Sequence, residues 1–390
     1  MPGEAIDYLI GMVITGIIAV SAVVVVPNLS YVNLFSVDQQ QLRNVASGTL
    51  KTMLLDAGYP SRWGSRQDFS DRTLQRFGLA LDSSSSFYVL DPDKVCRLIL
   101  DNPTGHLGYD TIKDRLKLQG YGFNFKILPP FNVTVNDGKP VDVNTVRNSG
   151  VRVRVTYNDG SPISNALVKS KIMYTVSKDT VQFYWATPPP TNTTDAVGKC
   201  TVKNVDPLFQ SATVLDFILI IKVTVANVAT FSATYNSGFH QQVASASIIG
   251  DTVTLWIPEN SIPNENPRGE RRIMDVVSVT EDGASTIYTG DVKDVMNWGE
   301  GYSYWTAQFP GLSNEDSAFL IFNIRVSLGH GEGLSYVLFL GPRPNWLGAR
   351  IQSYGDATGS KGASSAVKIQ RDVVISGMSY ISELTLWKES

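Results

Sequence analysis

An uncharged apolar run from Tyr8 to Val26 most constrains what this chain can fold into. A helix crosses the hydrocarbon core of a bilayer with about 20 apolar residues, because each residue rises about 1.5 Å. The run is long enough for that, whereas the rest of the chain is rich in strand-forming and turn-forming residues. We therefore predict a transmembrane or filament-core helix over residues 1-27 that holds a β-rich body.

The flanks of this run differ from those of a cleaved secretory signal. Such a signal has a basic segment before its apolar core and a small-residue cleavage site after it. The residues before this run, MPGEAID, include two acids and no lysine or arginine, and Pro27 follows the run directly. Because basic flanks are absent, the positive-inside rule does not orient the segment.

The residues from Gly3 to Ile10 resemble the start of archaeal type IV pilin-like proteins. In that family a glycine precedes a polar residue, an alanine, an acid and an aromatic–leucine pair. A dedicated peptidase cuts after the glycine, and the apolar helix is kept. The resemblance implies a processing site between Gly3 and Glu4. A plain signal-anchor helix that is not cut there is the alternative.

The region 28-145 is predicted to be a pilin-like α+β part. The segment DAGYP, followed by Trp63 and Gly64, and the later segment YVLDPDKV are similar to archaeal pilin-like proteins. Asp91 is read as a helix N-cap, with Pro92 as the first helical residue. Apolar periodicity and these end signals predict helices at 37–56, 92–100 and 109–116, and period-2 alternation predicts a strand within 121–135.

A second unit is predicted over 146-238. Its first residues alternate as a strand, turn at Asn158-Asp159-Gly160 and continue as a strand. This order, with a threonine-rich stretch before Gly198, resembles immunoglobulin-like surface domains and implies a β-sandwich. The apolar segment 215–235 contains Asp216 and Lys222, so we read it as core strands and not as a second membrane span.

Residues 239-390 are predicted to form a C-terminal β domain. Its last strands, paired about Gly377, resemble the end of archaeal pilin-like proteins. We therefore expect either a separate domain or strands that complete the pilin-like sheet. The predicted fold class is α+β, mostly β, with a long N-terminal hydrophobic helix followed by a pilin-like sheet body and an Ig-like β-sandwich.

The sequence contains no pattern typical of catalysis or of cofactor binding. The histidines at 106, 240 and 330 are widely separated, and none has a partner at metal-ligand spacing. Neither a G-x-S-x-G elbow nor a phosphate-binding loop is present. We predict no catalytic residues, no cofactor and no metal. The formal net charge of -3 gives no basic field for nucleic acid.

Two cysteines and three glycosylation sequons are the remaining candidates for modification. Cys96 and Cys200 are candidate partners in a disulfide that would close a loop of about 100 residues. Two separate buried thiols are the alternative. Sequons of the N-x-S/T type stand at Asn28, Asn132 and Asn192, and these asparagines are candidates for glycosylation if the body lies outside the cell.

These features predict a structural cell-surface protein: a pilin-like subunit, anchored by its N-terminal helix, that assembles into filaments or displays an adhesive β body outside the cell. Its expected partners are membrane lipid and further copies of itself, because small residues in the apolar run permit close helix contact. Surface glycans or envelope proteins are further candidates. The alternatives are a minor pseudopilin of a secretion or filament system, and a membrane-tethered envelope enzyme or carbohydrate-binding protein. For the last, the aromatic cluster with Trp298 and Trp305 is either a sugar platform or a packed loop.

Overall fold

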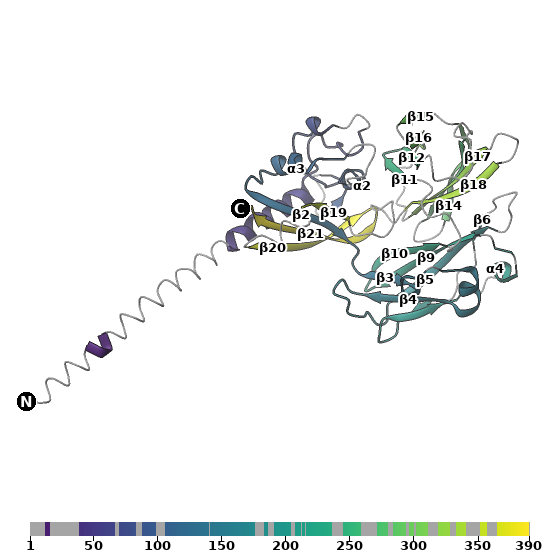
Figure 1. The fold of residues 1–390 in the computed structure, drawn as a ribbon, viewed down its shortest axis with the longest axis horizontal. Helices are drawn as coiled ribbons and strands as arrows, with labels where there is room; N and C mark the ends of the chain where they lie inside the picture. The colour runs from purple at the N-terminus through teal and green to yellow at the C-terminus, as the bar shows by residue number, and fades with distance from the viewer. Residues whose placement is uncertain are drawn as a thin grey trace, which may run out of the picture.

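The structure is a computed structural model, and most of the described residues form β-strands. It describes residues 12–15, 39–66, 70–82, 88–98, 106–139, 141–175, 183–185, 191–203, 207–211, 213–214, 216–235, 245–258, 271–279, 284–293, 296–299, 302–310, 319–327, 333–340, 352–356 and 365–389. The strands in these ranges form separate sheets that are arranged in two parts: a body that contains the C-terminal end of the chain and a larger distal part (Figure 1).

The predicted fold class is wrong in its helical part. We predicted an α+β fold with a long N-terminal hydrophobic helix, but the described chain is mostly β, and apart from an amphipathic helix over residues 39–55 its helices are short. Of residues 1-27, only the helical turn 12–15 is described. Within the described ranges, no helix is both long and apolar enough to span a membrane. The β-branched and aromatic residues that are plentiful in the described body favour strands, which explains why strands dominate it.

The first sheet joins the early part of the chain to its C-terminal end. Its strand order is β1-β20-β21-β2-β19. The bounds are Val89–Leu90 for β1, Tyr121–Leu128 for β2, Gln352–Gly355 for β19, Ala366–Ile375 for β20 and Met378–Lys388 for β21. The hairpin between β20 and β21 turns at Ser376 and Gly377, both with positive φ, which is typical of a two-residue hairpin loop.

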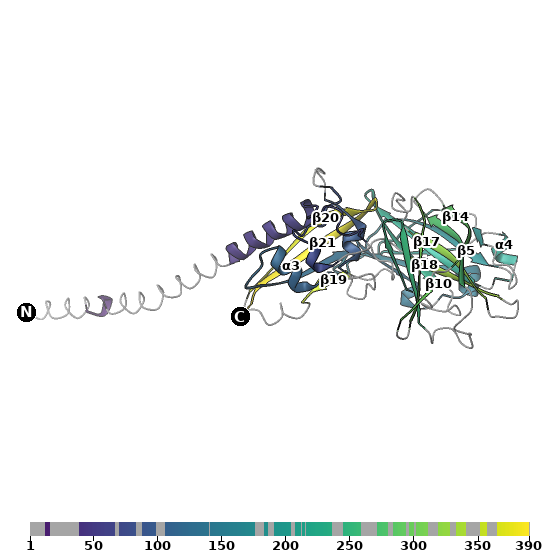
Figure 2. The same ribbon diagram turned by 90° about the horizontal axis from the view of Figure 1, so that it is seen from above.

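An amphipathic helix covers one face of this sheet. Residues 39–55 are helical and run along β20 and β21 (Figure 2). The apolar side of this helix, with Leu42, Leu50 and Met53, shares a core with Phe125 of β2 and Leu384 of β21. Three further short helices lie in this part of the chain: η1 (Asp71–Thr73), α2 (Pro92–Cys96) and α3 (Tyr109–Arg115).

The distal part of the chain is inserted between two neighbouring strands of the first sheet. Strand β2 ends at Leu128, and β19 begins at Gln352, which pairs with Ile127 in an antiparallel register. The chain therefore leaves the sheet after β2 and returns to it beside its point of exit. Residues 129–351 supply all the other described strands.

The first inserted unit is a sandwich of two sheets. One has the order β3-β4-β8, and the other has the order β10-β9-β5-β6, with β7 also paired to β5. The bounds are Asn132–Val135 (β3), Val151–Thr156 (β4), Leu167–Thr175 (β5), Phe183–Trp185 (β6), Asn192–Thr193 (β7), Lys199–Val202 (β8), Asp216–Val225 (β9) and Val228–Tyr235 (β10), with η2 (Asn136–Gly138), η3 (Thr145–Ser149) and α4 (Pro207–Ser211) between strands.

Strand β9 is buried on both faces, which explains why its sequence is almost continuously apolar. Phe217, Leu219 and Ile221 pack in the core between the two sheets of the sandwich. The alternate residues Ile218 and Ile220 belong to the other core cluster of the protein. A strand covered on both sides carries no polar alternation.

Two more four-stranded sheets complete the distal part. One has the order β11-β12-β16-β15 and the other β14-β13-β17-β18. Val277 of β13 and Ile321 of β17 belong to the same core cluster as Ile218 of β9, so one face of the second of these sheets contributes to that core. The bounds are Ser245–Ile249 (β11), Thr252–Pro258 (β12), Arg271–Val279 (β13), Ala284–Lys293 (β14), Met296–Gly299 (β15), Tyr302–Gln308 (β16), Phe319–Ser327 (β17) and Gly333–Leu340 (β18).

Candidate functional site: a buried polar network at helix α2

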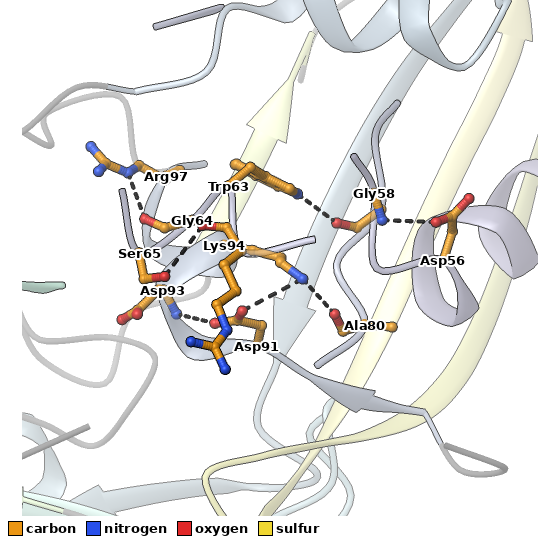
Figure 3. A network of polar contacts seen from close by, with 12 residues as sticks. Asp56, Gly58, Trp63, Gly64, Ser65, Ala80, Asp91, Asp93, Lys94 and Arg97 are labelled. Carbon is orange, nitrogen blue, oxygen red and sulfur yellow. Dashed lines mark hydrogen bonds and ion pairs between the residues drawn. The ribbon is translucent and has the colours of Figure 1, made fainter. Parts of the chain in front are cut away.

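The strongest concentration of buried charge in the described chain surrounds helix α2 (Figure 3). The helix begins with a side-chain cap, because Oδ1 of Asp91 accepts a hydrogen bond from the backbone N–H of Asp93 at 2.9 Å. Pro92 follows as the first helical residue, where its missing N–H costs no helical hydrogen bond. The cap and the proline fix where this short helix starts.

Lys94 is fully buried beside the capping carboxylate. Its Nζ donates a hydrogen bond to the carbonyl oxygen of Ala80 at 2.7 Å and lies 3.5 Å from Oδ2 of Asp91. Burial raises the pKa of Asp91, and the positive charge of Lys94 opposes that shift. Burial likewise lowers the pKa of Lys94, and Asp91 opposes that shift. Each charge therefore makes the burial of the other less costly.

Arg97, also fully buried, holds the segment that precedes the helix. Its Nε donates to the carbonyl oxygen of Gly64 at 3.0 Å, and its Nη2 donates to that of Arg66 at 2.5 Å. Burial lowers the pKa of the guanidinium to about 10, and Asp93 opposes that shift. Arg97 therefore remains charged at neutral pH and ties α2 to residues 64–66.

Further hydrogen bonds and one close backbone approach complete this network. Trp63 donates its indole N–H to the carbonyl oxygen of Gly78 at 3.1 Å. A Cβ atom on Gly64 would lie 2.5 Å from the backbone nitrogen of Lys94, so only glycine fits at this contact. Oδ1 of Asp56 accepts from the N–H of Gly58 at 2.7 Å. The loop after the helical residues 39–55 is thus fastened directly to α2.

Asp93 extends the network to the distal part of the chain. Its Oδ2 accepts a hydrogen bond from the backbone N–H of Gly250 at 3.0 Å. Gly250 lies in the turn between β11 and β12 and has a positive φ of 58°. Helix α2 and its C-cap residue Arg97 therefore bond to three separate parts of the chain: residues 64–66, Ala80 and the turn at Gly250.

The chemistry of this network is structural. The charged groups of Lys94 and Arg97 donate to backbone carbonyls, and the carboxylates of Asp91 and Asp93 accept from backbone N–H groups. Among the described residues, no group of histidine, cysteine, aspartate or glutamate side chains is arranged to hold a metal ion. The arrangement orders loops around α2, and each buried charge has a defined partner.

The disulfide candidate does not form in the structure. Cys96 is buried in α2, Cys200 is half-buried on β8, and neither of them is part of a disulfide bond. The two residues belong to different units, α2 beside the first sheet and β8 in the sandwich, so the structure agrees with the alternative of two separate thiols. Burial raises the pKa of the Cys200 thiol to about 11, which keeps it protonated at neutral pH.

The other sequence-predicted site residues are spread over the chain. Gly3, Glu4 and Asn28 lie outside the described residues. Asn132 is the first residue of β3, and Asn192 is the first residue of β7. The aromatic candidates Trp298 and Trp305 lie on the paired strands β15 and β16.

Asp91 and Pro92 were predictable from the sequence, whereas the burial of Lys94 and Arg97 was not. Lysine and arginine normally face water, and nothing in their spacing distinguishes a buried one from an exposed one. The glycines at 58, 64 and 78 were the available signal, since three glycines within one loop region permit close backbone packing.

Comparisons with known proteins do not place the chain in a family. No protein-family model matches it, and no curated protein matches it. Among solved structures it is similar to trypsin-activated alpha-2-macroglobulin from Escherichia coli, with 7% identity and a TM-score of 0.22 over 63% of this chain and 18% of that chain. It is also similar to invasin, a bacterial integrin-binding protein, with 10% identity and a TM-score of 0.17 over 65% and 54%. A third similarity is to a chimeric titin Z1Z2 tandem, with 11% identity and a TM-score of 0.15 over 55% and 95%. The chain thus spans less than two thirds of the first two, and TM-scores this low support no statement about fold or function.

Proposed function

We propose that the protein is a structural cell-surface protein, tethered through its N-terminal apolar segment, with its β body outside the cell. The observation that carries this proposal is the exposure of consecutive large apolar side chains: Met12 is 78% exposed, Val13 52% and Ile14 52%. They lie within the uncharged run Tyr8–Val26. Contiguous exposed apolar surface is unfavourable in water and needs a cover. Lipid, or the same segment of other copies, would supply it.

The arrangement of the body supports a display role. The helical residues 39–55 come next in the chain and pack on the first sheet, so this sheet is the part closest in sequence to the tether. Residues 129–351 leave and re-enter that sheet at its neighbouring strands β2 and β19. In Figure 1 the inserted sheets lie beyond the first sheet on the side away from the N-terminus. Such a layout presents the inserted units outward.

Within this class we propose a pilin-like subunit. The support is the resemblance of residues 3–10 to archaeal type IV pilin-like proteins, with the expected cut between Gly3 and Glu4. The apolar segment is kept after such a cut. Copies joined through it would form a filament, and the inserted β units would be its outer surface.

The test combines membrane fractionation with the intact mass of the native protein. We expect the full chain in the membrane or filament fraction, with a mature N-terminus at Glu4. A variant without residues 8–26 should be recovered in the soluble fraction, and Gly3→Val should keep its first three residues. Electron microscopy of cells that express the protein should show filaments. A soluble native chain that starts after Val26 would contradict the tethered-display proposal.

A further inference from the structure

We propose that Asn132 is the acceptor of an N-linked glycan. We also propose that the folded sandwich makes the second described sequon, at Asn192, inaccessible to the glycosyltransferase. The inference rests on the proposed function, because N-glycosylation acts on chains that reach the outer side of the membrane. In the reaction, Nδ2 of Asn132 forms a bond to the anomeric carbon of a polyprenyl-phosphate-linked sugar. The bond from that carbon to the phosphate oxygen breaks, the lipid phosphate leaves, and the amide proton passes to a base of the transferase.

The sequon at Asn132 lies on the outward side of the sandwich. Val133 and Val135 of β3 pack against the core between the two sheets. Successive side chains of a strand point to opposite faces, so Asn132 and Thr134 face away from that core. The Asn132 side chain is half-exposed and Thr134 is exposed. The transferase requires both side chains, and the fold leaves both within reach.

The sequon at Asn192 differs because its hydroxyl belongs to the fold. Thr194 is only 3% exposed. Its Oγ1 donates to the carbonyl oxygen of Ile163 at 2.7 Å and accepts from the N–H of Ala166 at 2.8 Å. The donor and an acceptor position of this hydroxyl are therefore occupied. A transferase could bind the hydroxyl of Thr194 only after the segment 163–166 had separated from this residue.

Backbone hydrogen bonds hold the same segment in place. The N–H of Thr194 donates to the carbonyl oxygen of Ala166 at 3.0 Å, and the carbonyl oxygen of Thr194 accepts from the N–H of Asn165 at 2.9 Å. Together with the two side-chain bonds, they tie Thr194 to residues 163–166 at four points. Releasing them would expose polar groups that the folded sandwich has buried.

The position of Asn132 gives the glycan a structural consequence. Asn132 follows Leu128, the last residue of β2, by four positions, and it starts the first strand of the sandwich. Between them, Phe131 is buried in the sandwich core. A glycan on Asn132 would cover the connection through which the chain passes from the first sheet into the displayed part.

The experiment measures glycan occupancy in the full chain, expressed in a host that N-glycosylates exported proteins, by mass spectrometry of glycopeptides. We expect a glycan on Asn132, and we expect the glycan occupancy at Asn192 to be at least tenfold lower than at Asn132. Asn132→Gln and Thr134→Val should each abolish the glycan at 132, whereas Asn192→Gln should leave it unchanged. A glycan at Asn192 at equal or higher occupancy than at Asn132 would overturn the inference.

A control sequon separates a failed site assignment from a failed export. Ala229→Thr completes a sequon at Asn227, an exposed residue in the turn between β9 and β10. If Asn227 is occupied and Asn132 is not, the body is exported and the assignment of Asn132 is wrong. If neither is occupied, the export that the proposed function requires is contradicted, and this inference falls with it.

Discussion

At the scale of single residues, interior polar atoms of this protein are satisfied chiefly by backbone groups. The hydroxyl of Thr194 bonds Ile163 and Ala166, and the ammonium group of Lys94 bonds Ala80. A buried polar group without such a partner costs free energy, because it has lost its hydrogen bonds to water. Among the described residues, the side-chain hydroxyl of Ser170 is a buried group with no partner.

We predict that Ser170→Ala raises the free energy of unfolding by about 1 kcal/mol. Ser170 lies on β5 opposite Ile221, and its neighbours along that face, Val168 and Ile172, belong to the sandwich core. The substitution removes an unsatisfied hydroxyl and creates a cavity no larger than one oxygen atom. Chemical denaturation followed by circular dichroism measures the change. The exposed Ser164→Ala is the control and should change stability by less than about 0.5 kcal/mol. A loss of stability in Ser170→Ala would show that a buried water holds the hydroxyl.

At the scale of elements, α2 shows how a five-residue helix becomes a fixed part of the fold. A helix this short is not stable through its own hydrogen bonds. Its stability comes from the Asp91 cap and from the bonds that Lys94 and Arg97 make to residues 64, 66 and 80. The network therefore supports the loops as much as the helix.

We predict that Lys94→Met lowers the free energy of unfolding by about 3 kcal/mol. The substitution leaves the carbonyl of Ala80 without its donor and leaves the buried Asp91 carboxylate without its cation. Thermal and urea unfolding of the full chain measure the loss. The matched control is Lys113→Met, which removes a more exposed ion pair with Glu389 and should cost less than about 1 kcal/mol. Equal losses in the two variants would contradict the structural role of the network.

The elements themselves were predictable where local signals specify them. The helix expected at 109–116 is confirmed as α3, Tyr109–Arg115, and the helix expected from Pro92 is confirmed as α2. The strand expected within 121–135 is instead two strands in different sheets. Pro129 and Pro130 separate them, because proline cannot donate a hydrogen bond to a strand ladder. The alternation continued through this break, so periodicity alone did not reveal it.

At the scale of the whole molecule, pairing between distant strands was the feature that local pattern could not determine. The hairpin of β20 and β21 about Gly377 was predictable from the sequence, but the second partner of β21 is β2, which lies more than 240 residues earlier in the chain. The contacts of the candidate site likewise depend on packing between segments that are far apart in the sequence. Asp93 meets Gly250 because two sheets are brought together, and nothing near either residue in the sequence indicates that contact.

This pairing means that the first sheet contains both ends of the described body. Its central strands β20, β21 and β2 come from the early and the last parts of the chain, and the insertion 129–351 contributes no strand to it. Ile127 and Gln352 are already paired across the point where the insertion begins and ends. A short turn could therefore replace the whole insertion without moving either strand.

We predict that a chain in which Leu128 is joined to Gln352 through a two-residue Asn-Gly turn folds as a single cooperative unit. It keeps the core in which Leu50, Phe125 and Leu384 meet. It should be less stable than the full chain by a few kcal/mol, because β10 lies against β21 in the full chain and the deletion exposes that contact. Urea unfolding and dispersed amide resonances measure the outcome. The control deletes 366–388 instead, which removes two central strands and should leave the rest of the first sheet unfolded. If the shortened chain is unfolded while the sandwich alone is folded, the first sheet depends on the inserted part for its stability, and the prediction that it folds by itself is wrong.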